Sequence, residues 1–77
     1  MELTVKYFGM LAEITGCNEE IITTNEGSIS DFLEALYSKY PPLKNKEFQV
    51  AQNNEITAKN SKISDTEIAL LPPFSGG

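Results

Sequence analysis

The chain has 77 residues and is 40% hydrophobic, which suits one compact domain and leaves no room for a second domain or a deep cofactor cleft. Six lysines against eleven acidic residues give a net charge of −5, which argues against nucleic acid as a partner, because phosphate binding needs clustered cations. Without arginine or histidine there is no guanidinium clamp and no imidazole, so we expect no self-contained catalysis, no bound cofactor and no metal.

The first part of the chain predicts two strands joined through a short helical turn. Residues 3–8 alternate between the two faces of a strand and are rich in β-branched and aromatic side chains. Residues 10–14 suit a helical turn that stops at Gly16. Residues 20–24 predict a second strand, which we expect to pair back on the first before the break at residues 25–27.

Residues 28–40 carry the clearest helical pattern. Apolar side chains recur there at spacings of three and four and therefore share one helix face: Ile29, Phe32, Leu33, Leu36, Tyr37 and Tyr40. Ser28 followed by Asp31 resembles a helix N-terminal cap, and both suit the positive end of the helix dipole. The Pro41-Pro42 pair predicts the end of the helix.

The rest of the chain predicts short strands. Residues 48–51 and 56–58 suit two strands around a turn at 52–55, and residues 59–62 form a polar loop. Residues 67–71 predict a last strand, in which Ile68 and Leu70 face one way while Ala69 and Leu71 face the other.

This order of elements predicts an α+β protein in which one main helix packs across a mixed β-sheet, the β-grasp or ubiquitin-like fold. The first and last strands are the natural central neighbours, and the helix lies in the right-handed connection between them if they are parallel. The alternative, an open ferredoxin-like sandwich, needs a second long helix that the pattern does not contain. We therefore expect a β-grasp domain over residues 1–71 and an extended, flexible tail over residues 72–77.

The end of the chain is the strongest candidate for chemistry. Pro72 and Pro73 favour an extended path that leads away from the sheet, and Gly76 and Gly77 lack side chains that would obstruct a narrow channel. A terminal carboxylate on such a tail can be delivered into the active site of another protein. The alternative is that the two glycines are a frayed end.

In this context the sequence resembles the MoaD family of ubiquitin-like sulfur carriers, the small subunits of molybdopterin synthase. The resemblance covers essentially the whole chain and is carried by YF at 7–8, AEITG at 12–16, VAQN at 50–53 and DTEIALLPPFSGG at 65–77. The Pro-Pro-x-Ser-Gly-Gly ending is its most specific part, because thiamine-pathway carriers share the two glycines but usually lack the proline pair.

The resemblance implies a role for the carboxylate of Gly77. A ubiquitin-activating-like adenylyltransferase would use ATP to adenylate it, and a cysteine desulfurase or rhodanese-type donor would supply sulfur to form a thiocarboxylate. The large synthase subunit would then accept the tail (Phe74, Ser75, Gly76 and Gly77) into its active site for sulfur transfer to a pterin precursor. The resemblance also suggests a heterotetramer with two carriers on a large-subunit dimer.

Apolar residues near the tail are the candidate interface with that large subunit. We expect Ile56, Leu71, Pro72, Pro73 and Phe74 to form a patch beside the tail, with Phe74 as its anchor. Core packing is the alternative for Leu71, and chance exposure is the alternative for Ile56 and Phe74.

Other reactive residues suggest no site. Cys17 is a single thiol followed by acidic residues, so we interpret it as structural, and we interpret the scattered acidic residues as a solvated face. With one cysteine, no signal-peptide pattern and no membrane-length apolar run, we expect a complete cytoplasmic protein.

Three other functions remain open from the sequence. The chain could carry sulfur for thiamine or another pathway, it could be a ubiquitin-like modifier conjugated to lysines through Gly77, or it could be an interaction module without covalent chemistry.

Overall fold

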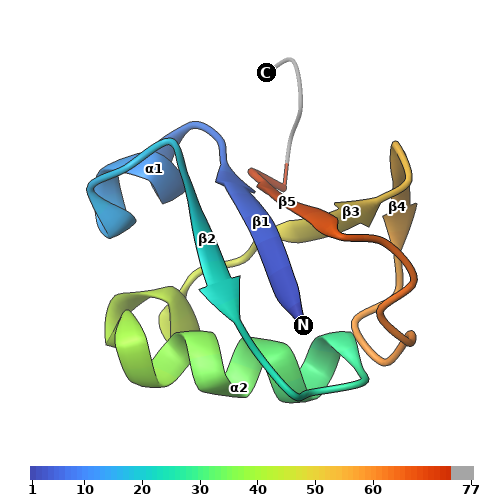
Figure 1. The fold of residues 1–77 in the computed structure, drawn as a ribbon. Coiled ribbons are helices and arrows are strands. Elements are labelled where there is room, and N and C mark those ends of the chain that lie inside the picture. Colours follow the sequence, from blue (N-terminus) through green and yellow to red (C-terminus); the bar gives the residue numbers. More distant parts are fainter. Residues whose placement is uncertain (74–77) are drawn as a thin grey trace.

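The computed structural model describes residues 1–73. Within this range the chain forms five strands, two α-helices and one 3₁₀ helix (Figure 1). In chain order they are β1 (Glu2–Tyr7), α1 (Met10–Thr15), β2 (Glu19–Thr23), α2 (Ile29–Lys39), η1 (Pro41–Asn45), β3 (Gln49–Gln52), β4 (Glu55–Thr57) and β5 (Glu67–Leu71).

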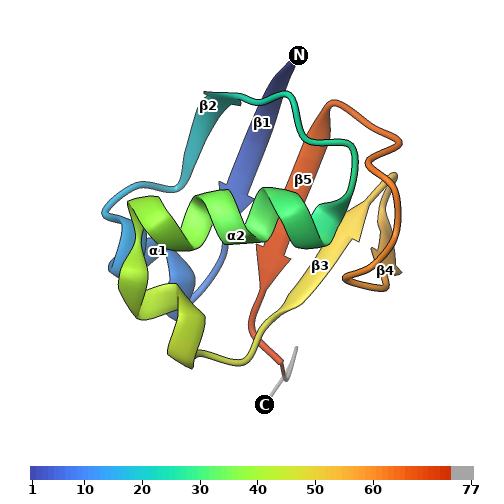
Figure 2. The same cartoon turned by 90° about the horizontal axis from the view of Figure 1, so that it is seen from below.

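The five strands form one mixed sheet in the order β2-β1-β5-β3-β4. β1 and β5 are parallel and central, whereas the other neighbouring pairs are antiparallel. Helix α2 lies across one face of this sheet (Figure 2). The predicted β-grasp fold is therefore confirmed, and the ferredoxin-like alternative is wrong, because residues 1–73 contain only one long helix.

The core lies between α2 and the inner face of the sheet. Its members are almost fully buried: Leu3, Val5, Tyr7, Leu11, Ile29, Phe32, Leu33, Leu36, Leu43, Phe48, Val50, Ile68 and Leu70. The alternation along β1 and β5 and the three-to-four spacing along α2 were both visible in the sequence, and they supply most of this list. The predicted helix face is confirmed, with Tyr37 and Tyr40 partly buried at its end.

Local chemistry sets the ends of α2. The hydroxyl of Ser28 accepts a hydrogen bond from the backbone N–H of Asp31 at 3.2 Å, so the predicted cap is confirmed. The helix ends at Lys39 before Pro41 and Pro42. These prolines do more than stop the helix, because they start η1, and the completely buried Leu43 of η1 adds to the core.

The hairpin between β3 and β4 turns through Asn53 and Asn54, which have positive φ angles of 57° and 62°. Asparagine tolerates this left-handed conformation, and consecutive positive φ values suit the twist of a two-residue hairpin. The predicted turn is thus confirmed. In residues 1–73, no helix has the length and apolar character that a membrane crossing requires.

Candidate functional site

The candidate site begins where β5 ends. β5 runs in the middle of the sheet beside β1, and its last residue is Leu71. The backbone N–H of Phe8, just after β1, donates to the carbonyl oxygen of Leu70 at 3.1 Å. This bond continues the parallel pairing of β1 with β5 as far as Leu70. The backbone just before Pro72 and Pro73 is therefore hydrogen-bonded into the sheet.

Leu71 and Ile56 meet in one groove on the outer face of the sheet. Leu71 points away from the core and is half-buried, and Ile56 on β4 is 56% exposed. The groove has a volume of about 370 Å³, and Phe8 also lines it with 45% of its surface exposed. Leu71 therefore lies outside the buried core, and its role in an interface stays a prediction.

Phe8 is a groove residue that we did not select from the sequence. The signal was present, because the alternation that buries Leu3, Val5 and Tyr7 places Phe8 on the opposite face. An exposed phenylalanine beside the candidate interface is the kind of side chain that anchors a protein contact.

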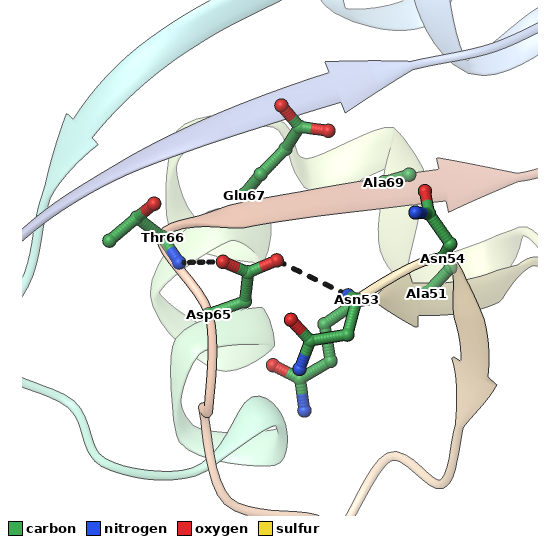
Figure 3. A pocket seen from close by; sticks show the side chains of 8 residues that line it. Ala51, Asn53, Asn54, Asp65, Thr66, Glu67 and Ala69 are labelled. Carbon is green, nitrogen blue, oxygen red and sulfur yellow. Dashed lines mark hydrogen bonds between the residues drawn. The ribbon is translucent and has the colours of Figure 1, made fainter.

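A second, more polar groove adjoins the first, and Figure 3 shows the residues that line this second groove. It has a volume of about 410 Å³ and shares with the apolar groove the residues Ala51, Asn54, Glu67 and Ala69. Ala51 and Ala69 are direct partners in the β3–β5 register, and their small side chains leave the middle of the outer face hollow.

Asp65 organises the polar groove. One carboxylate oxygen accepts a hydrogen bond from the N–H of Thr66 at 2.7 Å, and the other accepts from the N–H of Asn53 at 3.2 Å. These bonds tie the loop before β5 to the β3–β4 hairpin. Across the sheet, Glu67 forms a solvent-exposed ion pair with Lys6 at 3.4 Å, which contributes little to stability. Residues 1–73 contain no cluster of potential metal ligands.

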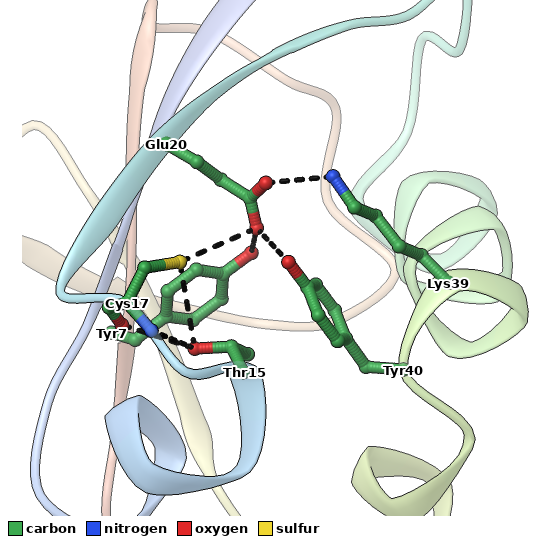
Figure 4. A network of polar contacts seen from close by, with 6 residues as sticks. All are labelled: Tyr7, Thr15, Cys17, Glu20, Lys39 and Tyr40. Atoms are coloured by element: carbon green, nitrogen blue, oxygen red, sulfur yellow. Dashed lines mark hydrogen bonds and ion pairs between the residues drawn. The ribbon is translucent and has the colours of Figure 1, made fainter.

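Glu20 departs from the predicted solvated acidic face (Figure 4). Its side chain is only 17% exposed and accepts three hydrogen bonds, from Tyr7 Oη at 2.7 Å, Tyr40 Oη at 2.6 Å and Lys39 Nζ at 2.7 Å. The prediction was wrong for this residue because Glu20 faces inward on β2, opposite Val5, at the edge where α2 ends.

This network shifts the pKa values of its members in opposite directions. Burial alone would raise the pKa of Glu20, but the hydrogen bonds from Lys39, Tyr40 and Tyr7 outweigh it, and the pKa is lowered. The pKa of Tyr7 is raised by its burial and by its bond to Glu20. The pKa of Tyr40 is raised first by the same carboxylate and then by burial. The network thus links β1, β2 and the end of α2 through the side chains of Tyr7, Glu20, Lys39 and Tyr40, and we call these four residues the clasp.

Cys17 lies at the margin of the clasp. It is partly buried, and its Sγ is 3.8 Å from Thr15 Oγ1 and 3.9 Å from a carboxylate oxygen of Glu20. Reactive cysteines lie in electropositive surroundings, whereas the charged group within 4 Å of this Sγ is the carboxylate of Glu20. This geometry supports the structural interpretation of Cys17.

The predicted tail residues Phe74, Ser75, Gly76 and Gly77 lie outside the described residues. Pro72 and Pro73 are described and are half-buried after the end of β5. β5 ends at Leu71, and the division into a domain over residues 1–71 and an extended, flexible tail over residues 72–77 stays a prediction.

Comparison with protein families decides what kind of domain this is. The model of the ThiS family matches residues 5–77, almost the entire chain. The chain belongs to the ThiS family. The molybdopterin synthase sulfur carrier subunit of Chlamydomonas reinhardtii is 31% identical over 83 residues, and the alignment covers 100% of each chain.

Solved structures agree with this assignment. The putative molybdopterin converting factor subunit 1 of Pyrococcus furiosus superposes with a TM-score of 0.85 at 21% identity, covering 96% of this chain and 99% of that one. At this identity the likeness supports the fold alone. SAMP1 of Haloferax volcanii superposes with a TM-score of 0.81 at 27% identity over 100% of both chains. The predicted resemblance to ubiquitin-like sulfur carriers is confirmed.

Proposed function

We propose that this ThiS-family protein is the sulfur-carrier subunit of a molybdopterin synthase and that its Gly77 carboxylate carries the sulfur as a thiocarboxylate. The observation that carries the proposal is the match to a relative named as such a subunit, which runs over the full length of both chains. The family match extends through Gly76 and Gly77, and the Pro72-Pro73 pair favours this pathway over a thiamine-type carrier.

The chemistry requires activation of Gly77 by a partner. The carboxylate attacks the α-phosphorus of ATP, forming an acyl adenylate and releasing pyrophosphate, and AMP then becomes the leaving group. The terminal sulfur of a donor persulfide attacks the carbonyl carbon and expels AMP, giving an acyl disulfide. A second thiol attacks the donor's sulfur, which forms a donor disulfide and releases the thiocarboxylate.

The carrier contributes placement, and its partners contribute catalysis. Lacking arginine and histidine, it supplies no guanidinium for phosphate and no imidazole for proton transfer, so the adenylyltransferase and the large synthase subunit supply these groups. No cofactor binds the carrier in this scheme, and ATP is used by the adenylyltransferase. The sulfur donor is a cysteine desulfurase or a rhodanese-type protein.

The outer-face groove is the docking surface for the large subunit in this scheme. Ile56, Leu71 and Phe8 line this groove with apolar surface, and Leu71 directly precedes Pro72, where the chain leaves the sheet. Phe74, which follows the prolines, would add the anchor. A heterotetramer with two carriers on a large-subunit dimer is the expected assembly.

Intact-protein mass spectrometry tests the proposal. After incubation with the adenylyltransferase, ATP and the sulfur donor, the chain should gain the mass difference between sulfur and oxygen. A chain lacking Gly77 and a chain extended by one residue beyond it should both fail to gain this mass. Co-purification of the large synthase subunit should then separate this pathway from a thiamine-type one. A wild-type chain that never gains sulfur would refute the proposal.

A second candidate function is a ubiquitin-like modifier. It is supported by the likeness to SAMP1 of Haloferax volcanii, whose full name is small archaeal modifier protein 1. In one of its structures, the sequence of SAMP1 is 27% identical to this chain. This function predicts isopeptide adducts between Gly77 and target lysines, which peptide mass spectrometry of the chain's cellular conjugates would detect. A plain interaction module predicts neither product and tolerates the loss of Gly76 and Gly77.

A further inference from the structure

Gly9 makes an unusually close approach to the base of the tail. It follows Phe8 at the end of β1 and has φ +58° and ψ −133°, a conformation that residues with a side chain rarely adopt. A Cβ atom built on Gly9 would lie 2.8 Å from Cγ of Pro72, closer than real Cβ contacts allow. The ring of Pro72 therefore occupies space that a side chain at residue 9 would fill.

The backbone around Gly9 is held from two sides. The N–H of Phe8 donates to the carbonyl oxygen of Leu70 at 3.1 Å, which ties the segment to β5. The carbonyl oxygens of Phe8 and Gly9 accept from the N–H groups of Leu11 and Ala12, both at 3.1 Å, which ties it to the first turn of α1. Because Leu11 is completely buried, α1 is itself anchored in the core. The backbone of Gly9, against which the ring of Pro72 lies, is thus held in place, and we call it the seat of Pro72.

We propose that Gly9 is a positioning residue that seats Pro72 and thereby sets the direction in which the chain leaves the sheet toward Gly77. This inference rests on the function proposed for Gly77. The proline ring fixes φ at residue 72, so a seat that fixes the ring also fixes the starting direction of the segment. Gly77 lies five residues further on, so the direction set at Pro72 is the starting point from which a partner must bring the reacting carboxylate into place.

The matched variants are Gly9→Ala and Gly16→Ala. Gly16 also has a positive φ, +80°, so alanine is strained at both positions, but a Cβ on Gly16 meets nothing within 4 Å. The readout is adenylation of Gly77 by the adenylyltransferase, measured as ATP–pyrophosphate exchange over a range of carrier concentrations. We expect Gly9→Ala to lower kcat by about tenfold or more with little change in KM, since misplacement of a reacting group by about 1 Å can cost two orders of magnitude. Gly16→Ala should retain the wild-type kcat.

Pro72→Ala tests the contact between residues 9 and 72 without adding backbone strain at Gly9. It removes Cγ while leaving Gly9 in place, and we expect it to lower kcat in the same way. In the double variant Gly9→Ala/Pro72→Ala the clash is absent, so its kcat should match that of Pro72→Ala alone and not the product of the two losses. Equal kcat values for Gly9→Ala and Gly16→Ala, or a wild-type kcat for Pro72→Ala, would overturn the inference.

A measurement on the isolated chain distinguishes failure of this inference from failure of the proposed function. Residual dipolar couplings of the Phe74 amide report the direction of the segment after the prolines. Gly9→Ala should change these couplings and Gly16→Ala should not, whether or not any enzyme adenylates Gly77. Unchanged couplings in a folded Gly9→Ala chain, judged by its amide spectrum, would refute the positioning role. If Gly9→Ala does not fold, the double variant Gly9→Ala/Pro72→Ala, which lacks the clash, should fold and give the couplings of Pro72→Ala, and different couplings would refute the positioning role.

Discussion

The two faces of the same sheet have opposite properties. On the inner face, which α2 covers, the side chains of β1 and β5 are at most 2% exposed and belong to the core. On the outer face, the neighbouring side chains of the same strands are half-buried or exposed, and alanines opposite each other leave a groove. A domain of this size buries only about 60% of its unfolded surface, so one packed face supplies most of its stability. The second face is then available for a partner.

Two adjacent leucines give the sharpest test of this difference. Leu70 is completely buried on the inner face, whereas Leu71 is half-buried on the outer face of the same strand. Leu70→Ala should lower the free energy of unfolding by about 2–5 kcal/mol, because it leaves a cavity in the core. Leu71→Ala should cost roughly 1 kcal/mol, because it removes less buried surface and leaves no cavity. Urea unfolding measures both, and equal losses would contradict the comparison.

The clasp around Glu20 gives the next largest effect. Glu20→Gln keeps the shape but removes the charge that three donors share, and we expect a loss of about 1–3 kcal/mol at neutral pH. Its control is Glu19→Gln, one residue earlier and exposed on the outer face, which should stay within about 0.5 kcal/mol of the wild type.

The pH dependence of the same variant follows from the lowered pKa of Glu20. Its contribution is present above the ordinary glutamate pKa of about 4.3 and is lost as the pH falls through the lower value of the folded state. The wild type should therefore lose more stability than Glu20→Gln as the pH falls below about 4.3. If the free energies of unfolding of the wild type and Glu20→Gln fell in parallel as the pH is lowered, the contribution of Glu20 would not depend on its charge.

The tyrosines of the clasp predict the opposite behaviour in alkali. The pKa values of Tyr7 and Tyr40 are raised in the folded chain, so their contribution is complete below the ordinary tyrosine pKa of about 10 and is lost as the pH rises beyond it. Tyr40→Phe should cost about 1 kcal/mol at neutral pH and should flatten the loss of stability above pH ~10. Thermal unfolding midpoints across this range measure the effect, and an unchanged alkaline slope in Tyr40→Phe would contradict the prediction.

The inner face was predictable from the sequence because alternation and helical spacing report it directly. Alternation puts Ile68 and Leu70 on one face of β5, helical spacing puts Phe32 and Leu36 on one face of α2, and all four are buried. The same alternation puts Leu71 on the face opposite Leu70. It could not show that Ile56 and Leu71 line one groove, because that depends on the pairing of β3 with both β4 and β5.

Two other features depend on contacts between residues far apart in the chain. Glu20 meets Tyr40, twenty residues later, only because β2 lies beside the end of α2, and no local pattern distinguishes it from its exposed neighbour Glu19. The seat of Pro72 on Gly9 joins the two ends of the sequence through the parallel β1–β5 pair. Local patterns specify which face a residue occupies, whereas the partners across the sheet are set by topology.

The smallest expected effect on stability concerns two isoleucines at opposite edges of the outer face. Ile56 on β4 is 56% exposed and lines the groove, whereas Ile21 on β2 is 66% exposed and lies outside it. Each substitution to alanine should change the free energy of unfolding by less than about 1 kcal/mol, because both side chains are already largely in water.

The effects of the two substitutions on partner binding should differ. Ile56→Ala should weaken binding to the large synthase subunit by about tenfold or more, since buried apolar anchors dominate interface energies, and Ile21→Ala should leave it unchanged. Isothermal titration calorimetry of both variants measures this, and a loss at Ile21 equal to that at Ile56 would mean that the partner covers the entire face and not the groove beside Pro72.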